Sequence, residues 1–172
     1  MKSRDYRRNL DLYFENDSIQ YGLLIERQKF GQLYQKTLKE LKTYLTDLSQ
    51  TPIDSTQNIV VNYLTALPKI PEITKSRSGW NVLDRNYLKK LPRIAPIHQF
   101  CINSPDSDNL KYYHQNKINW ITDKDNLFKK LFFPYEVKYG NYILIKPDGK
   151  FYNFMGEHSK YKIWETAEQY FK

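Results

Sequence analysis

The sequence predicts an α+β fold: a helical amino-terminal half, residues 1–92, packed on a carboxy-terminal half, residues 93–172, with a small, mostly antiparallel sheet and a final helix. Apolar residues before Pro92 recur mainly at helical steps, and after Pro92 they alternate or form short runs bounded by turn residues. At 172 residues the chain is long enough for one domain with a sizeable core. We therefore expect a single domain over residues 1–172.

The first predicted element is an amphipathic helix over residues 18–49, with Asp17 or Ser18 as its N-cap. Such a helix would be roughly 45 Å long, so Gly31 is a candidate for a break into two helices. Its basic face indicates a solvated surface or, as the alternative, a stripe that follows phosphates. The apolar face consists of Leu23, Leu24, Phe30, Tyr34, Leu38, Leu41, Leu45 and Leu48, and the basic face of Arg27, Lys29, Lys36, Lys39 and Lys42.

Two shorter helices are predicted in the rest of this half. The second helix begins at Asp54 or Ser55 and ends at Pro68, and its apolar residues form one buried stripe. Residues 68–80 contain two prolines and no periodicity, which indicates an exposed connection. A third helix covers residues 81–91.

The carboxy-terminal half begins with a predicted strand over residues 97–103, which alternates in a way that suits two partly covered faces. A turn follows over residues 103–109. Residues 110–122 suit either a hairpin about Gln115 and Asn116, which we favour, or a helix. Further on, the pattern predicts a short helix over residues 123–134, capped by Asp123 or Asp125, and a final helix over residues 159–171 that packs across the sheet.

Residues 142–154 predict a hairpin. Pro147 suits the first central position of a type I turn, and Gly149 suits the left-handed position of a three-residue hairpin bulge. Alternation places Ile143, Ile145 and Phe151 on a core face. The other face predicts either ordinary packing or a surface on which bases stack while lysines meet phosphates. That face consists of Tyr142, Leu144, Lys146, Lys150, Tyr152 and Phe154.

The charge balance favours a polyanionic partner. The chain has 27 Lys and Arg against 19 Asp and Glu, a formal charge of +8. The excess is spread along the chain, +5 through Pro92 and +3 after it, so a solvated positive surface is the alternative. The single cysteine, Cys101, cannot form an internal disulfide, which favours a reducing compartment and hence the cytoplasm. We expect no membrane association, because the sequence has no apolar run of signal-peptide or membrane-spanning length.

Catalytic and metal-binding patterns are sparse. His98 and Cys101 have H-x-x-C spacing, but no second pair completes a zinc site, so we expect no metal and no cofactor. Cys101 could act as a nucleophile only with His114 or His158 folded beside it. Glu157 and His158 form the one pair suited to acid–base chemistry. The sequence therefore favours a non-enzymatic role without excluding an enzyme.

The leading hypothesis is a non-enzymatic nucleic-acid-associated protein that binds RNA or single-stranded DNA. The alternative is a protein-binding accessory subunit or inhibitor of a larger complex, such as a nucleic-acid-processing, defence, phage or mobile-element assembly, because the 15 tyrosines suit an interface. A small hydrolase is the third candidate. The residues predicted to bind nucleic acid are Lys75, Arg77, Trp80, Tyr142, Lys146, Lys150 and Tyr152.

Overall fold

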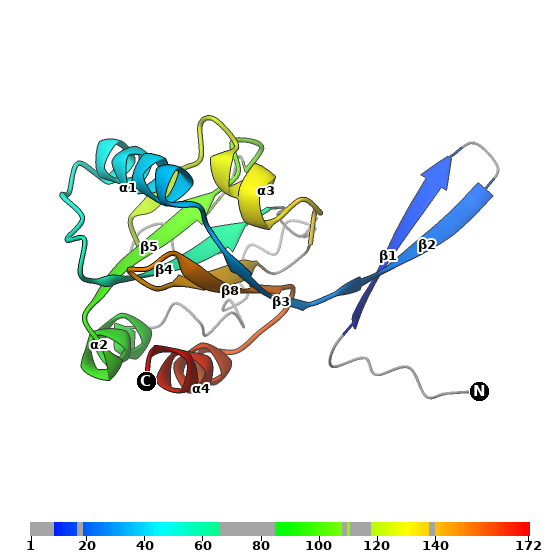
Figure 1. The fold of residues 1–172 in the computed structure, drawn as a ribbon. Helices are drawn as coiled ribbons and strands as arrows, with labels where there is room; N and C mark the ends of the chain where they lie inside the picture. Colours follow the sequence, from blue (N-terminus) through cyan, green and yellow to red (C-terminus); the bar gives the residue numbers. More distant parts are fainter. Residues whose placement is uncertain (1–8, 17–18, 66–84, 108–109, 111–117, 138–139) are drawn as a thin grey trace.

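The computed structural model describes residues 9–16, 19–65, 85–107, 110, 118–137 and 140–172 (Figure 1). In chain order its elements are β1 (Asn9–Asn16), β2 (Ile19–Glu26), β3 (Gln28–Gln32), α1 (Gln35–Ser49), β4 (Asn58–Leu64), α2 (Arg85–Ile94), β5 (Ile97–Asn103), β6 (Trp120–Thr122), α3 (Leu127–Phe132), β7 (Asn141–Ile145), β8 (Lys150–Met155) and α4 (Lys160–Phe171). Strands β1 and β2 form a separate hairpin. The other strands form one mixed six-stranded sheet in the order β3-β8-β7-β4-β5-β6.

Strand β4 lies inside the sheet because its sequence can be buried on both faces. It pairs in parallel with β5 and antiparallel with β7. Ile59, Val60 and Val61 follow one another in it, and none is more than 1% exposed. β-Branched residues suit the extended backbone, and a continuous apolar run is typical of a strand covered on both sides.

Helices cover both faces of the sheet. Helices α1 and α3 lie on one face, and α2 and α4 lie on the other (Figure 1). The alternation predicted for the β7–β8 hairpin is confirmed: Ile143, Ile145 and Phe151 belong to the core beneath α1 and α3. Tyr142 and Tyr152 belong to the second core, beneath α2 and α4. Both faces of the hairpin are therefore core faces.

The predicted fold class is wrong, because the sheet is mixed and has six strands, and the described residues before Pro92 include the four strands β1 to β4 beside helices. Residues 19–32 form β2 and β3 rather than the start of a long helix, and only Gln35–Ser49 is helical in that region. The second predicted helix is replaced by β4. The spacing of apolar residues alone could not distinguish a helix from a strand here, since backbone pairing with distant strands outweighs local preference.

Gly31 marks a close approach between strands and not a break between helices. It lies in β3 opposite Phe151 of β8. A Cβ atom at this position would lie 2.3 Å from Cζ of Phe151. Glycine is therefore required here because the ring of Phe151 occupies the space of a side chain.

Several predictions for the carboxy-terminal half are confirmed. Strand β5 has the predicted bounds, Ile97–Asn103. In the β7–β8 turn, Gly149 has a φ of 89° and its N–H donates to the carbonyl of Lys146 at 2.9 Å. Helix α4 begins after Ser159, whose Oγ accepts a hydrogen bond from a backbone N–H of its first turn. One boundary near the middle of the chain was predicted wrongly: helix α2 continues to Ile94 and contains Pro92, which was predicted to end it.

Two predicted segments, the exposed connection over residues 68–80 and the hairpin about Gln115 and Asn116, lie outside the described residues. Of the ambiguous stretch 110–122, the described end forms the short strand β6. Among the helices that the structure describes, none is both long enough and apolar enough to cross a membrane.

The β1–β2 hairpin projects from the sheet, and we call it the arm (residues 9–16 and 19–26; Figure 1). Its strands pair along their whole length, from Asn9 opposite Glu26 to Asn16 opposite Ile19. At its base, the side chain of Ile25 is 8% exposed and belongs to the core beneath α1 and α3. No strand was predicted in this region from the sequence.

A buried carboxylate joins α1, β4 and α3. Oδ1 of Asp123 accepts hydrogen bonds from the hydroxyl of Tyr44 at 2.7 Å and the N–H of Leu127 at 2.9 Å. Its Oδ2 accepts from the hydroxyl of Tyr63 and the N–H of Phe128, both at 3.0 Å. The N-cap of α3 is Asn126 rather than the predicted Asp123 or Asp125, but Asp123 accepts hydrogen bonds from the first amides of the helix. These donors, with the positive end of α3, stabilise a charge that burial would otherwise disfavour.

Replacing Asp123 should destabilise the protein strongly. We expect Asp123→Ala to lower the free energy of unfolding by about 3 kcal/mol or more, because two tyrosine hydroxyls and the first amides of α3 lose their acceptor. Asp123→Asn should cost less, because one acceptor oxygen remains. The measurement is urea unfolding at pH 7, with the exposed Asp125→Ala as the matched control. Equal losses in Asp123→Ala and Asp125→Ala would contradict the assigned role.

Candidate functional site

A pocket of about 490 Å³ lies between α1 and the loop that leads into β4, and we call it the α1 pocket. Its volume is in the range of sites for small molecules. The residues that line it are Gln35, Leu38, Lys39, Lys42, Thr43, Thr46, Ile53, Ser55 and Pro147. Leu38, Ile53 and Pro147 form its apolar part, and the other side chains are polar.

Four of the polar side chains that line the α1 pocket share one face of α1. Lys39, Lys42, Thr43 and Thr46 are separated by steps of three and four, which places them side by side on a helix. Ammonium, hydroxyl and amide groups all donate hydrogen bonds. None of the residues that line the pocket is acidic. The pocket therefore offers positive charge and donors to whatever enters it.

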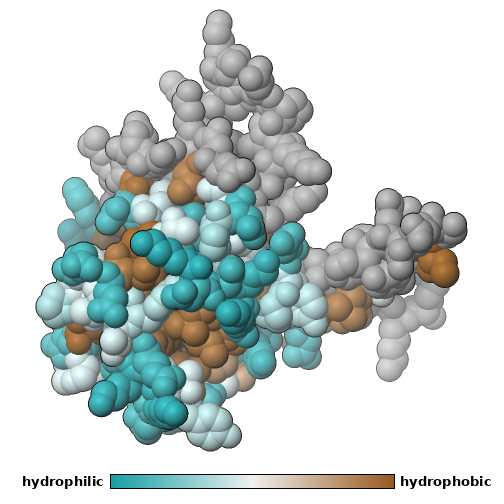
Figure 2. Space-filling model, turned by 90° about the horizontal axis from the view of Figure 1, so that it is seen from above, coloured by the Kyte–Doolittle hydropathy of each residue, from teal (hydrophilic) through white to brown (hydrophobic). Residues whose placement is uncertain are grey.

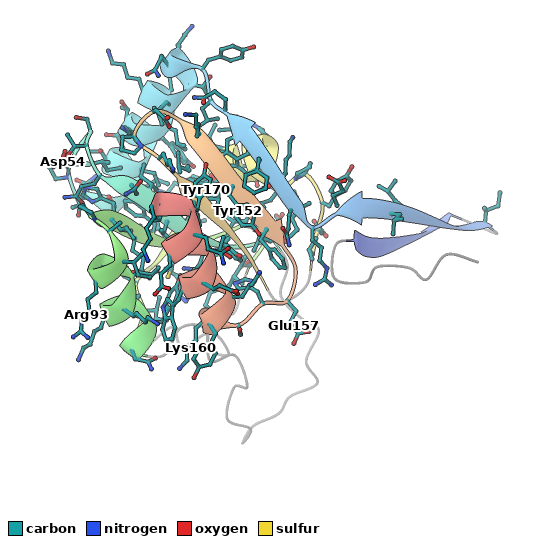
Figure 3. The ribbon with its side chains drawn as sticks, turned by 60° about the horizontal axis from the view of Figure 1, so that its bottom comes forward. Asp54, Arg93, Tyr152, Glu157, Lys160 and Tyr170 are labelled. Atoms are coloured by element: carbon teal, nitrogen blue, oxygen red, sulfur yellow. The ribbon has the colours of Figure 1, made fainter. Side chains whose placement is uncertain are left out.

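The loop before β4 fixes one of these donors. Nζ of Lys42 donates to the backbone carbonyl of Ser55 at 3.2 Å, which holds the ammonium at the edge of the pocket and leaves it further N–H groups. The acid in this loop, Asp54, which is labelled in Figure 3, accepts hydrogen bonds from Thr56, two residues further along the chain. Its Oδ1 accepts from the N–H of Thr56 at 2.8 Å and from the Thr56 hydroxyl at 2.7 Å. These hydrogen bonds hold the pKa of Asp54 below its usual value.

A second pocket, of about 300 Å³, borders Cys101 on β5. The thiol is buried, and burial raises its pKa to about 12, so it stays protonated and is a poor nucleophile. Nε2 of His98 accepts a hydrogen bond from the N–H of Asp54 at 2.9 Å, which occupies one of its two ring nitrogens. Within the described part of the chain, no group of three or more His, Cys, Asp or Glu is placed to hold a metal ion.

His158 and Glu157 do not form an acid–base pair. Nδ1 of His158 donates to the carbonyl of Gly156 at 2.8 Å, and its ring lies 4.8 Å from that of Tyr142. Burial lowers the pKa of His158 to about 4, so the ring is neutral near pH 7. Glu157 is exposed at the end of β8 (Figure 3). The histidine is therefore part of the packing beneath α4.

The aromatic residues predicted to stack on bases are buried. Tyr142 is 0% exposed and Tyr152 is 3% exposed. The hydroxyl of Tyr142 lies 3.2 Å from that of Thr166 on α4. The ring of Tyr152 lies 6.2 Å from that of Tyr170 on the same helix (Figure 3). Neither ring is available to an outside partner.

The two lysines of the predicted site have local partners. Nζ of Lys146 lies 4.9 Å from the centre of the Tyr170 ring. Nζ of Lys150 lies 3.0 Å from a carboxylate oxygen of Asp148, at the exposed turn. The remaining predicted residues, Lys75, Arg77 and Trp80, lie outside the described residues. Of the predicted aromatic residues that the structure describes, Tyr142 and Tyr152, neither is exposed beside these lysines.

The α1 pocket was not predicted from the sequence. Lys39 and Lys42 were assigned to the basic face of a longer helix, Ser55 was named only as a possible start of the second helix, and Thr43 and Thr46 were not singled out. The helical spacing of hydrogen-bond donors along residues 39–46, without an acid on the same face, could have indicated an anion-binding surface on this helix. The wall formed by Ser55 was not predictable, because residues 54–67 were assigned to a helix.

No protein-family model and no curated protein matches the chain. Its structure is similar to that of MTB dsbF in mixed oxidized and reduced forms, with a TM-score of 0.45 and 13% identity over 66% of this chain and 81% of that chain. It is also similar to a secreted Mycobacterium tuberculosis disulfide oxidoreductase homologous to E. coli DsbE, with a TM-score of 0.41 and 12% identity over 71% of this chain and 91% of that chain. A third similar structure is the exposed lipoprotein thioredoxin Etrx1 from Streptococcus pneumoniae, with a TM-score of 0.41 and 11% identity over 93% of this chain and 99% of that chain. TM-scores this low do not assign the chain to the family of those proteins.

The prediction of a nucleic-acid-associated protein is wrong. It required exposed tyrosines beside gathered cations, and Tyr142 and Tyr152 are closed beneath α4. The predicted RNA-binding role is wrong for the same reason.

The two other predicted functions are also wrong. An accessory subunit was inferred from tyrosine abundance, but Tyr63, Tyr87, Tyr142 and Tyr152 are core residues. Packing in the two cores explains these four tyrosines without an interface. A small hydrolase was inferred from Glu157 and His158, and the buried, neutral His158 does not suit that chemistry.

Stability should fall in mild acid because of His158. Its pKa is about 4 in the folded protein and near 6.5 when unfolded, so the unfolded state binds the proton first as the pH falls. We expect the free energy of unfolding to decrease by about 1 kcal/mol per pH unit between these two values. Urea unfolding at pH 7 and pH 4.5 measures this, and His158→Leu should remove the difference in part. A His158 ring that titrates near pH 6.5 by NMR would contradict the prediction.

The thiol of Cys101 should be inert in the folded protein. We expect an aromatic disulfide reagent to react at least about 100-fold more slowly with the native chain than with the urea-unfolded chain, because the thiol is buried and protonated. The measurement is the rate of thiolate release at pH 8. Equal rates for the native and unfolded chains would show that Cys101 is accessible.

Proposed function

We propose that this chain is a binding protein for a small anionic molecule, one that carries a carboxylate or phosphate group, with the α1 pocket as its site. The observation that supports this function is the set of donors around the apolar part of the pocket, with no acid among the lining residues. A bound anion would accept charge-assisted hydrogen bonds from Lys39 and Lys42. The rest of the ligand would cover Leu38 and Ile53.

The surroundings of Lys39 and Lys42 determine how strongly and how selectively we expect the α1 pocket to bind anions. Lys39 is exposed and Lys42 is half-buried, so added salt should screen the first more than the second. The hydroxyls of Thr43, Thr46 and Ser55 add donors that carry no charge. We therefore expect preference for compact anions with several acceptor oxygens over singly charged ones such as chloride.

The disulfide chemistry of the structurally similar proteins is not part of this proposal. Exchange between a dithiol and a disulfide within one chain needs two cysteines, and this chain has one. A single-cysteine mechanism would need an accessible thiolate, whereas Cys101 is buried and its pKa is raised. The chain's own residues thus favour binding over thiol redox chemistry.

We also propose that the protein acts in the cytoplasm and that residues 1–172 form a single domain. The lone cysteine supports a reducing compartment. The two cores share the strands of one sheet, which supports a single unit.

Removing the charge of Lys42 should weaken anion binding. We expect Lys42→Gln to raise the dissociation constant for inorganic phosphate or citrate by about tenfold or more, because one charge-assisted hydrogen bond is lost. Isothermal titration calorimetry at low salt, with the full chain, measures the two constants.

Lys36→Gln provides the matched control. Lys36 lies on the same helix, its Nζ is 4.0 Å from Glu40 on the exposed surface, and it does not line the pocket. Both variants lose one positive charge, so a general effect of net charge would weaken binding equally in both. Equal weakening, or no binding of phosphate and citrate by the unaltered chain, would overturn the proposed function.

A further inference from the structure

The arm exposes apolar side chains that the rest of its own chain does not cover. Ile19, Leu23 and Leu24 on β2 are 69%, 39% and 55% exposed. Figure 2 shows hydrophobic side chains on this projecting part of the molecule. Leu23 and Leu24 are neighbours in a strand, so they point to opposite faces of the ribbon. Both faces of the arm therefore carry exposed leucine.

The arm has too few neighbours to be stable by itself. In the described residues, β1 and β2 pair with each other and with no further strand. A lone two-stranded hairpin is marginally stable in water, because it has no third layer to cover its apolar residues. Apart from Ile25 at the base, the apolar residues described on the arm are open to solvent. A partner surface would supply the missing layer.

The charge of the arm is opposite to that of the chain that follows it. Residues 9–26 contain four acids, Asp11, Glu15, Asp17 and Glu26, and no Lys or Arg. Residues 27–172, which we call the body, contain 23 basic and 14 acidic residues, a formal charge of +9. Two arms would repel each other, whereas an arm and the body of another copy would attract each other. The partner that fits this pattern is a second copy of the chain.

The body offers a receiving surface on β3, directly after the arm. Strand β3 is the edge of the six-stranded sheet and pairs on one side with β8. The ring of Phe30 on β3 is 67% exposed and rests on Tyr152 and Tyr170, with centres 5.0 and 6.2 Å away. Nζ of Lys146 lies over Tyr170. An edge strand with an exposed aromatic and a nearby cation suits an acidic, apolar hairpin.

We propose that the arm of one copy packs on β3 and the surface around Phe30 of a second copy, so that two equivalent arm–body contacts form a two-fold dimer. The arm extends over about 26 Å, which exceeds the length of β3, so one arm can cover the whole edge strand. The dimer places Leu23 or Leu24 against Phe30 and brings acids of the arm to the basic body. This inference does not depend on the α1 pocket.

The oligomeric state tests the proposal. Light scattering coupled to size-exclusion chromatography of the full chain should give a dimer at low salt, with partial dissociation at high salt. Leu23→Ser and Leu24→Ser should each raise the dimer dissociation constant by about tenfold. Leu88→Ser on α2 is the matched control, because Leu88 is 37% exposed and lies on the body. A monomer under all conditions, or equal effects of Leu23→Ser and Leu88→Ser, would overturn the proposal.

Cysteine pairing between copies tests which surfaces meet. The native Cys101 is buried and should not interfere. When Leu24→Cys and Phe30→Cys chains are mixed under mild oxidation, we expect a disulfide-linked heterodimer. Leu24→Cys alone should cross-link far less, because the proposed dimer separates the two arms. If Leu24→Cys alone cross-links as well as the mixture, the arms pack on each other and the proposal fails. Circular dichroism of each variant verifies that the fold is retained.

Discussion

The burial of β4 on both faces is the constraint from which the rest of the fold follows. A strand of this composition cannot face water on either side, so the chain must place a helical layer above it and another below it. Helices α1 and α3 supply one layer, and α2 and α4 supply the other. The strands beside β4 are buried for the same reason, and this accounts for the apolar residues on both faces of the β7–β8 hairpin.

The buried polar groups stabilise this arrangement of a sheet between two helical layers. Asp123 connects the two tyrosine hydroxyls of α1 and β4 to the first turn of α3, so one carboxylate aligns three elements. Asn141 Nδ2 donates to the carbonyl of Tyr63 at 3.3 Å, across β4 and β7. Buried tyrosines and asparagines are thus explained by packing and hydrogen bonding inside the sheet. The functional proposals rest on features outside it, namely the α1 pocket and the arm.

The carboxy-terminal half could be predicted well because its signals are local. The turn at Gly149, the final helix and the strand β5 each depend on neighbouring residues. The amino-terminal strands could not be predicted, since β3 and β4 pair with β8, β5 and β7, all far along the chain. A short continuous apolar run such as that of β4 does not by itself distinguish a strand from a buried helix. The same error hid the α1 pocket, because Ser55 reaches α1 only if residues 58–64 are a strand.

The order of the strands has a consequence for synthesis of the protein on the ribosome. Strand β4 leaves the ribosome well before its antiparallel neighbour β7, and β3 well before β8. Until residues 141–155 emerge, β4 lacks one neighbour and β3 lacks its partner in the sheet. A nascent chain of this design therefore keeps apolar strands unpaired until late in translation, which lengthens the time during which it needs protection from aggregation.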